Sequence, residues 1–281
     1  MALSAAAAAP RALWASAAKA EGAVVKSERA FGYKRSVSRW TVTDLDWEEL
    51  CSWLAAEEIE AVDLVGPENW HHLKKYGLDS SMCNGAELNL VDGFIHSEFE
   101  GVLHERYSEM IPRVAKAGYT NLICFSGNRR GLSEEAGMEQ ALQSLLPMVK
   151  LAEEHGVVLQ MELFNSIVDH PDYMADSSRW GVELAKKLGS PSFKLLYDIY
   201  HMQIMEGNLL ANIKENHQYY GHYHVAGVPG RNEPWNNQEI NYPAVMQAID
   251  ANGFEGYVAL EYVFKEPLKE SMRRSYDEFI R

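Results

Sequence analysis

Four side chains that can bind a metal ion or carry a proton follow short apolar runs in this sequence. Each run has the length and composition of a buried strand, and each ends in a carboxylate or an imidazole. The residues are Glu162, Asp198, His224 and Glu261. Successive members lie roughly 25 to 40 residues apart, about the length of one strand, one helix and two short loops. The spacing predicts four potential ligands, each at the end of the strand in one of several repeating strand–helix units.

Taken alone, the clearest of these runs has a simpler explanation. Residues 194–198 are an apolar run that ends in Asp198, and His201 follows three residues later. An aspartate in this position is commonly a turn former or a helix N-cap. The recurrence of the same pattern at three other places favours a role in a shared site.

Convergence of three carboxylates would create an electrostatic conflict. At about 4 Å and an effective dielectric constant near 20, each pair of carboxylates repels by roughly 4 kcal/mol. Without a cation, such a group would have to take up protons or move apart. Three carboxylate oxygens and one imidazole suit one divalent ion, either Mn²⁺, Mg²⁺ or Co²⁺. The alternative is that one or two of the four residues only support the others or form ion pairs with them.

The histidines near these runs have different expected positions. His222 and His224 are two residues apart in one strand, so both face the same side. We expect His224 to be the ligand because it lies nearer the loop, whereas His222 is either a buried structural histidine or a support for the site. His201 is expected in a loop over the site, where it could contact a substrate oxygen.

Strands and helices alternate along the chain after residue 30. The expected strands are 35–40, 59–65, 87–91, 120–125, 157–162, 193–197, 221–225 and 256–261. The expected helices are 44–56 (capped by Asp44), 70–76, 98–117, 134–155, 173–188, 209–216, 242–251 and 270–280.

This order predicts parallel strands joined by right-handed crossovers, and no linker divides residues 31–281. We therefore expect an α/β protein with one domain, a closed (β/α)8 TIM barrel, whose chemistry lies at the carboxyl ends of the strands. A doubly wound open sheet is the alternative, but the glycine-rich phosphate loop that it needs after its first strand is missing.

The overall composition excludes some classes of function. The net charge is −14, and no run of Lys and Arg exceeds two residues, which argues against a nucleic-acid partner. Cys51, Cys83 and Cys124 are far apart, so neither a disulfide framework nor a zinc knuckle is expected.

Residues 1–30 differ from the rest of the chain. Their alanine-rich stretch resembles the apolar part of an export signal with a cleavage-like end at residues 18–20, but the preceding basic region is missing. The stretch is too short and too rich in alanine for a membrane span. If residues 1–20 are a truncated signal peptide, the protein is exported or periplasmic. A mitochondrial-type presequence or a disordered tail is the alternative, and without an export signal the protein is expected in the cytoplasm.

Several stretches resemble one protein family. They are residues 125–129, 161–166, 196–203, 224–234 and 239–242. Together they resemble the hydroxypyruvate isomerase family, which belongs to the xylose isomerase-like barrels alongside the ketose 3-epimerases. The resemblance extends from about residue 33 to residue 263.

The resemblance implies a metal-dependent isomerase. One divalent ion would be held at Glu162, Asp198, His224 and Glu261, and the two glutamates would also act as the acid–base pair. The implied reaction interconverts a small 2-hydroxy carbonyl pair, hydroxypyruvate and tartronate semialdehyde, by proton transfer through an enediolate.

His201 and Arg231 are the candidates for binding the oxygens or carboxylate of this small-molecule substrate. Weaker candidates are Arg129, Asp169, His170 and Glu233. The sequence leaves open whether the protein forms a homo-oligomer.

Three other functions remain as alternatives. Members of the family often carry glutamine at the position of His224, whereas the epimerases carry histidine, so a ketose 3-epimerase or a related sugar isomerase is the first. A catalytically inactive sugar-binding barrel is the second, although both glutamates are present. A metal-dependent phosphodiesterase acting on abasic DNA shares this barrel, but it would need more ligands for several ions and a basic surface.

Overall fold

The computed structural model describes residues 31–279 with the exception of residue 236. The predicted signal-like segment, residues 1–30, lies outside the described part of the chain.

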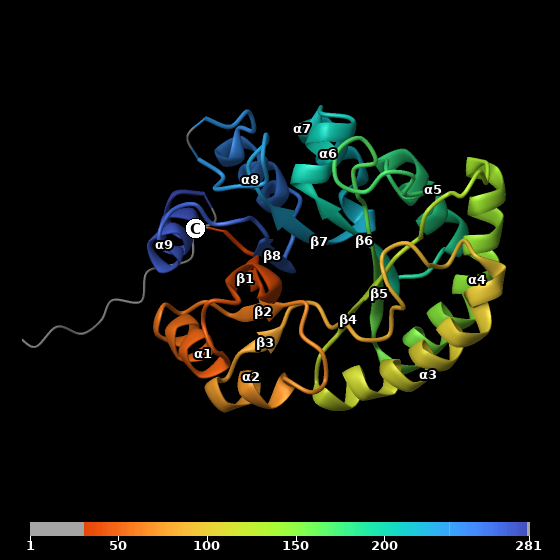
Figure 1. Cartoon of the computed structure of the whole chain (residues 1–281), viewed down its shortest axis with the longest axis horizontal. Coiled ribbons are helices and arrows are strands. Elements are labelled where there is room, and N and C mark those ends of the chain that lie inside the picture. The colour runs from red at the N-terminus through yellow and green to blue at the C-terminus, as the bar shows by residue number, and fades with distance from the viewer. Residues whose placement is uncertain (1–30, 236, 280–281) are drawn as a thin grey trace, which may run out of the picture.

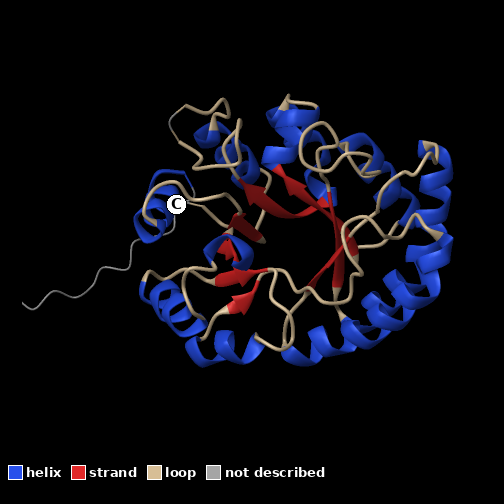
Figure 2. Cartoon of the chain, viewed as in Figure 1, coloured by secondary structure: helices blue, strands red, loops and turns tan. Residues whose placement is uncertain are grey.

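Strands form a central ring, and helices surround it (Figure 1, Figure 2). The strands are β1 (Lys34–Ser38), β2 (Ala61–Asp63), β3 (Asp79–Ser80), β4 (Asn121–Cys124), β5 (Val158–Glu162), β6 (Phe193–Asp198), β7 (Tyr220–Val225) and β8 (Tyr257–Leu260). The helices are α1 (Trp47–Ala56), α2 (Trp70–Tyr76), α3 (Glu100–Ala117), α4 (Glu134–His155), α5 (Ser178–Leu188), α6 (Ile199–Met205), α7 (Leu209–Asn216), α8 (Tyr242–Ala251) and α9 (Leu268–Phe279). Short 3-10 helices span Arg39–Val42, Ser97–Phe99 and His217–Tyr219.

The sheet closes into a barrel through a short contact between β4 and Cys83, which lies in the segment after β3. The strand order is β3-β2-β1-β8-β7-β6-β5-β4, and the paired neighbours are parallel. After β3, the Cys83 N–H donates to the Asn121 carbonyl at 2.9 Å, and the Ile123 N–H donates to the Cys83 carbonyl at 3.0 Å. The predicted single-domain (β/α)8 TIM barrel is therefore confirmed.

The two faces of the strands have different environments. In β5, Leu159 and Met161 are buried in the apolar core, whereas Gln160 and Glu162 alternate with them and face the opposite side. Polar side chains inside the barrel bond to one another, as when Gln160 Nε2 donates to Asn121 Oδ1 at 2.9 Å. Gln160 and Asn121 are thus paired across β5 and β4, which limits the cost of burying these two amides.

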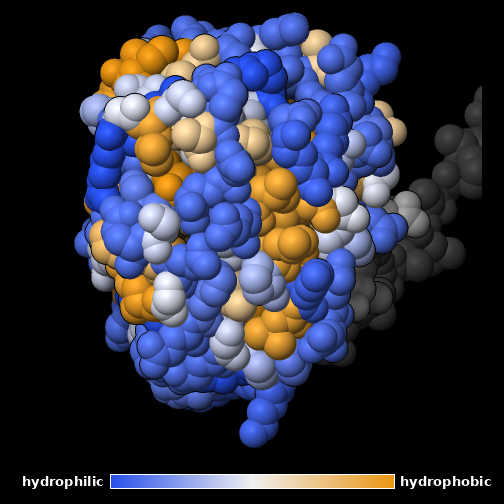
Figure 3. All heavy atoms as spheres, turned by 90° about the vertical axis from the view of Figure 1, so that its right-hand side faces the viewer, coloured by the Kyte–Doolittle hydropathy of each residue, from blue (hydrophilic) through white to orange (hydrophobic). Residues whose placement is uncertain are grey.

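The outer surface on the side of α3, α4 and α5 is mainly hydrophilic (Figure 3). Figure 3 shows the side of the barrel that carries α3, α4 and α5, on which apolar residues gather in separate patches between polar ones. This arrangement follows from amphipathic helices that turn their apolar sides toward the strands. Among the described residues, none of the helices combines the length and the apolar character that crossing a lipid bilayer requires.

The third predicted strand is wrong. Residues 87–91 form a loop in which the side chain of Asn89 accepts hydrogen bonds from the N–H groups of Val91 and Asp92, both at 2.8 Å. These local bonds take the place of sheet pairing. The third strand lies instead at Asp79–Ser80, directly after α2, where the sequence lacks the apolar alternation of a strand.

The segment after Asp198 was also predicted wrongly. It forms α6 in place of the expected loop, and Asp198 caps this helix by accepting a hydrogen bond from the His201 N–H at 3.1 Å. The simpler interpretation of Asp198 as a helix cap therefore holds together with its place in the site.

Two other helix starts differ from expectation. Asp46, in place of Asp44, caps α1 by accepting from the Glu49 N–H at 2.8 Å. The helix predicted to begin at residue 173 begins at Ser178, where α5 is capped by the side chain of Ser177. In both cases the residue with the capping hydroxyl or carboxylate marks the true helix start.

A glycine in the loop before α3 allows the chain to pass close to the end of β4. A Cβ atom on Gly93 would lie 2.4 Å from the Phe125 carbonyl oxygen and 2.5 Å from the Ser126 carbonyl carbon. These are backbone atoms that cannot rotate away. We therefore expect Gly93→Ala to lower the free energy of unfolding by about 1–3 kcal/mol, measured by chemical denaturation.

Gly101→Ala is the matched control, because a Cβ there meets nothing within 4 Å and the residue lies in α3. Alanine at this position should leave the stability unchanged or raise it slightly. Equal denaturation midpoints for Gly93→Ala and the wild type would contradict the prediction.

Candidate active site

The four predicted ligands meet at the carboxyl-terminal end of the barrel. Glu162 and Asp198 are the last residues of β5 and β6, His224 lies in β7, and Glu261 directly follows β8. The parallel register sets Asp198 beside His224. All four side chains are buried, and one potential ligand atom of each lies within 4.8 Å of those of the others. The structure thus brings together residues from four strands.

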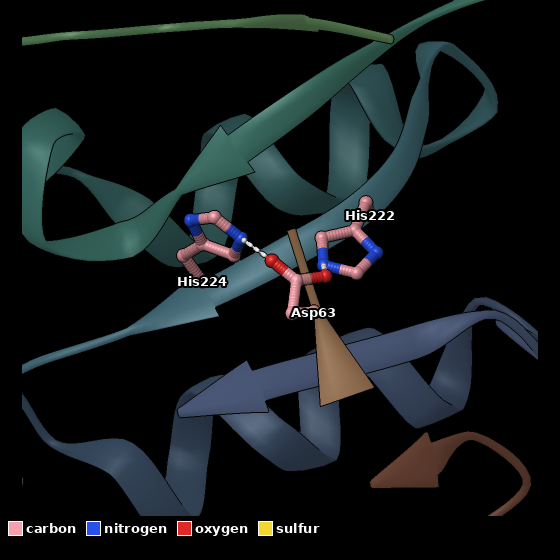
Figure 4. A group of neighbouring side chains, drawn as sticks. All are labelled: Asp63, His222 and His224. Carbon is pink, nitrogen blue, oxygen red and sulfur yellow. Dashed lines mark hydrogen bonds and ion pairs between the residues drawn. The ribbon is translucent and has the colours of Figure 1, made fainter. Parts of the chain in front are cut away.

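His224 is the centre of this cluster. Its Nδ1 atom lies 3.1 Å from Glu162 Oε1, 2.9 Å from Glu261 Oε2 and 3.8 Å from Asp198 Oδ2. On the other side of the ring, Nε2 lies 2.9 Å from Asp63 Oδ2 and is hydrogen-bonded to it (Figure 4). An ionised carboxylate can only accept, so the proton of this bond belongs to Nε2.

Burial and charge determine the protonation of the cluster. Burial alone would lower the pKa of His224, but the charges of Glu261 and Asp63 raise this pKa well above its ordinary range. Burial raises the pKa of Glu162 to about 8, because the facing imidazole offsets only part of the lost hydration. Burial also acts to raise the pKa of Glu261, but the charges of His224 and Arg231 outweigh it and hold this pKa low.

The residues present fit a divalent cation. Three carboxylates and one imidazole surround a common buried space, and these are the donors that hard divalent ions prefer. Among the residues that the structure describes, the imidazole and Arg231 offset the surplus of negative charge, and Arg231 lies 2.5 Å from Glu261 and 3.7 Å from Asp198. Glu162, Asp198, His224 through Nδ1, and Glu261 are the residues that could hold the ion.

His201 lies in the first turn of α6 and is fully buried, in contrast to the loop position expected for it. The Asn165 side chain fixes its tautomer. Asn165 Oδ1 accepts from the N–H groups of Val168 and Asp169, so Nδ2 is the atom that faces His201 Nδ1, at 2.7 Å. His201 Nδ1 is therefore an acceptor, and Nε2 carries the proton.

The protonated nitrogen of His201 is available to a ligand. Nε2 lies 3.6 Å from Asp198 Oδ2 and has no hydrogen-bond partner among the described residues. Burial lowers the pKa of His201 to about 4, so the ring is neutral near pH 7.

Arg231 lies beside the cluster, on the loop after β7. Its guanidinium carbon is 5.2 Å from the ring centre of Trp40 and 5.4 Å from that of Tyr200. Cation–π contacts with these rings and the ion pair with Glu261 hold the side chain close to the buried carboxylates. Trp40 also donates from Nε1 to Glu261 Oε1 at 2.7 Å.

Sequence reasoning missed the role of Asp63. It lies in β2, fully buried, and contacts both His224 and His222, whose Nε2 is 3.0 Å from Asp63 Oδ1. His222 is thus buried beside Asp63, a position that fits either of the two roles left open for it. An acidic residue inside the apolar run 61–65 was the available signal.

Two of the weaker candidates bond to residues other than the cluster, and the other two lie next to His201. Arg129 forms an ion pair with Asp176 at 2.9 Å, and Glu233 accepts backbone hydrogen bonds from Lys265 and Glu266. Asp169 and His170 lie next to His201, with Asp169 Oδ2 3.9 Å from His201 Nδ1 and the two histidine ring centres 5.3 Å apart.

The pKa of Glu162 predicts how the metal-free protein responds to pH. Between its unfolded pKa of about 4.3 and its folded pKa of about 8, the folded state keeps a proton that the unfolded chain has released. The folded state then binds more protons, so the free energy of unfolding decreases as pH rises. The raised pKa of His224 acts in the same direction. We expect a loss on the order of 1 kcal/mol between pH 7 and pH 8 for chelated protein, measured by denaturant unfolding.

Glu162→Gln is the control, because it cannot titrate and should reduce this pH dependence. A free energy of unfolding that is constant or increases over the same interval in the chelated wild type would contradict the assignment.

Comparison with known proteins supports the same architecture. The family model described as xylose isomerase-like TIM barrel matches residues 68–279. A Homo sapiens protein provisionally named hydroxypyruvate isomerase is 35% identical over 132 residues, which cover 47% of this chain and 48% of that protein. A protein of Cupriavidus necator named 2-oxo-tetronate isomerase is 33% identical over 121 residues, 43% of this chain and 46% of that protein. The chain thus spans about half the length of these relatives.

Among solved structures, the crystal structure named AP endonuclease, family 2, from Brucella melitensis is similar with a TM-score of 0.78 and 21% identity. The match covers 89% of this chain and 99% of that one, and at this identity it supports the fold alone. Because the family model covers most of the residues and the barrel is the one that it describes, the chain belongs to the xylose isomerase-like TIM barrel family.

Proposed function

We propose that this chain is a metal-dependent isomerase that interconverts a small 2-hydroxy carbonyl pair, with hydroxypyruvate and tartronate semialdehyde as the first choice. One observation carries the proposal: Glu162 and Glu261, from opposite sides of β7, both approach His224 Nδ1 within about 3 Å. Two carboxylates therefore border one small space, as a proton shift between neighbouring carbons requires. The names of the sequence relatives support the same class of reaction.

The protein groups have separate tasks in this reaction. Glu162, Asp198, His224 and Glu261 would hold the ion. A bound divalent ion supplies Lewis-acid stabilisation of the negative charge that develops on the two substrate oxygens. His201 would donate its Nε2 proton in a hydrogen bond to a substrate oxygen, because that proton has no other partner among the described residues.

The two glutamates would move the protons. For hydroxypyruvate, one carboxylate removes a proton from the hydroxymethyl carbon, and the other delivers a proton to the former carbonyl carbon. The hydroxyl proton passes to the former carbonyl oxygen, which yields tartronate semialdehyde by way of an enediolate. Positioned bases of this kind contribute typically about 10²–10⁴-fold to the rate. The reaction is reversible, so each glutamate takes both roles.

Arg231 would bind the carboxylate of the substrate. Its side chain lies at the edge of the cluster and already pairs with a carboxylate, Glu261. A planar guanidinium can bind a substrate carboxylate through two parallel hydrogen bonds.

A ketose 3-epimerase is the second candidate, and His224 favours it, because the resemblance associates histidine at this position with the epimerases. It would use the same glutamates to remove and return a proton at one carbon. A DNA-cleaving activity is disfavoured by the net charge of −14, despite the fold shared with the Brucella protein. An inactive binding barrel is disfavoured because both glutamates are present and buried together.

The experiment that tests the proposal is an interconversion assay with metal-loaded and chelated protein. We expect Mn²⁺, Mg²⁺ or Co²⁺ to support interconversion of hydroxypyruvate and tartronate semialdehyde, with uptake of deuterium from D₂O at carbon. Full turnover after exhaustive chelation would exclude the proposed metal site. Exchange on a ketose without turnover of hydroxypyruvate would favour the epimerase, and metal binding without any exchange would indicate a binding protein.

Glu162→Gln and Glu261→Gln are expected to lower the turnover number by about 10²–10⁴-fold. Glu109→Gln is the matched control, since Glu109 is exposed on α3 and pairs only with Arg113 among the contacts described. Its activity should equal that of the wild type, and a small loss in both active-site variants would contradict the assigned role.

Arg231→Lys should separate the two substrate classes. Lysine keeps the charge but cannot form the two parallel hydrogen bonds of the guanidinium group. We therefore expect the KM for hydroxypyruvate to rise about tenfold, with a smaller change in the turnover number. Neutral ketoses, which have no carboxylate, should show little change in KM. An equal effect on both substrates, measured by steady-state kinetics, would show that Arg231 does not bind the carboxylate.

A further inference from the structure

We propose that Asp63 is a positioning residue for the metal site, which holds His224 in the ring orientation and tautomer that present Nδ1 to the three carboxylates. This inference depends on the metal site of the proposed function. Asp63 comes from β2 and approaches His224 of β7 from across the barrel (Figure 4). It is outside the group of four candidate ligands.

The hydrogen bond between Asp63 and His224 determines which nitrogen is free. Asp63 Oδ2 lies 2.9 Å from His224 Nε2, and both side chains are fully buried, so neither group is exposed to bulk water. Because the carboxylate only accepts, the neutral ring must carry its proton on Nε2. Nδ1 then has a free lone pair, and it points at Glu162 and Glu261. Carboxylates that accept from the distal nitrogen of a ligating histidine fix its tautomer and make it a stronger donor to the metal.

Asp63 is itself held in place from two directions. Ser81 Oγ lies 2.8 Å from Asp63 Oδ1 and donates to it, and the same hydroxyl is 2.6 Å from Ser36 Oγ. His222 Nε2 lies 3.0 Å from Oδ1 on the remaining side. With Oδ1 engaged by Ser81 and close to His222, Oδ2 faces His224. The position of the His224 ring therefore depends, through Asp63, on Ser36 in β1, Ser81 directly after β3 and His222 in β7.

The same residues could be viewed as a second cation site. Ligand atoms of Asp63, His222 and His224 lie within 4.8 Å of one another. Both carboxylate oxygens are already engaged, Oδ1 by the Ser81 hydroxyl and Oδ2 by the His224 N–H. A cation there would have to displace these protons, so the positioning role accounts for the geometry without further change. The number of ions bound per chain separates the two cases.

Metal affinity tests the proposal without reliance on activity. Mn²⁺ binding is measured by calorimetry or by competition with a chelator for the wild type, Asp63→Asn and Asp63→Leu. We expect one ion per chain and a dissociation constant raised about 10- to 100-fold in both variants. The larger effect is expected for leucine, which has the shape of aspartate and cannot accept a hydrogen bond.

Asp79→Asn is the matched control. Asp79 lies in β3 of the same barrel and accepts from the Tyr257 hydroxyl at 2.6 Å, at the opposite end of the strands from the cluster. Its metal affinity should equal that of the wild type. Unchanged affinity in both Asp63 variants, or two ions per wild-type chain, would overturn the positioning role. Absence of any metal binding by the wild type would instead refute the proposed function.

A measurement on the unaltered protein decides the question if the variants do not fold. Nitrogen-15 NMR of histidine-labelled protein loaded with diamagnetic Mg²⁺ reports the tautomer of each ring. We expect His224 to carry its proton on Nε2, in slow exchange with water. A proton on Nδ1 or rapid exchange of the Nε2 proton would overturn the proposal.

Discussion

Four carboxylates buried around a single imidazole create the constraint on which the rest of this structure depends. Asp63, Glu162, Asp198 and Glu261 have almost no contact with water, and charges removed from water must be paired. Within the described residues, His224 and Arg231 provide the compensating charge. Burial acts to lower the pKa of His224, but the charges of Glu261 and Asp63 outweigh it and raise this pKa. A divalent ion at the same place would relieve the carboxylates more completely and would displace the Nδ1 proton of the ring. The site therefore has an electrostatic reason to bind a cation.

Some residues of the site also stabilise the fold. Asp198 ends β6, caps α6 and belongs to the cluster, so the strand, the helix and the site share one side chain. The cap also fixes the start of α6 and thereby the position of His201. Asn165 completes that arrangement from the loop after β5, because its oriented amide leaves the proton of His201 on the buried nitrogen nearest Asp198. Asp198 and His201 are thus held by hydrogen bonds that join β6, α6 and the loop after β5.

The order of strands and helices and the convergence of the four candidate ligands could be predicted, because both depend on local patterns. Apolar runs ending in Glu162, Asp198, His224 and Glu261 recur with the period of a strand–helix unit, and parallel strands of a barrel end at one rim. The third strand could not be found in this way. With two residues it has no readable alternation, and its pairing depends on β2 and on the bridge at Cys83. The first turn of α6 was missed because its apolar residues continue the strand pattern of β6.

The sequence by itself determined the fold class, the family and the set of residues able to bind a cation. Each of these follows from residue types that recur at regular spacing along the chain. Only the tertiary structure decided which groups orient them. Asp63 is 161 residues from His224, and Trp40 is 221 residues from Glu261. Partners so far apart leave no periodic signal, because contacts across a closed barrel depend on the register and twist of all strands between them. The burial of His201 likewise depends on a loop and a helix that meet only in the folded chain.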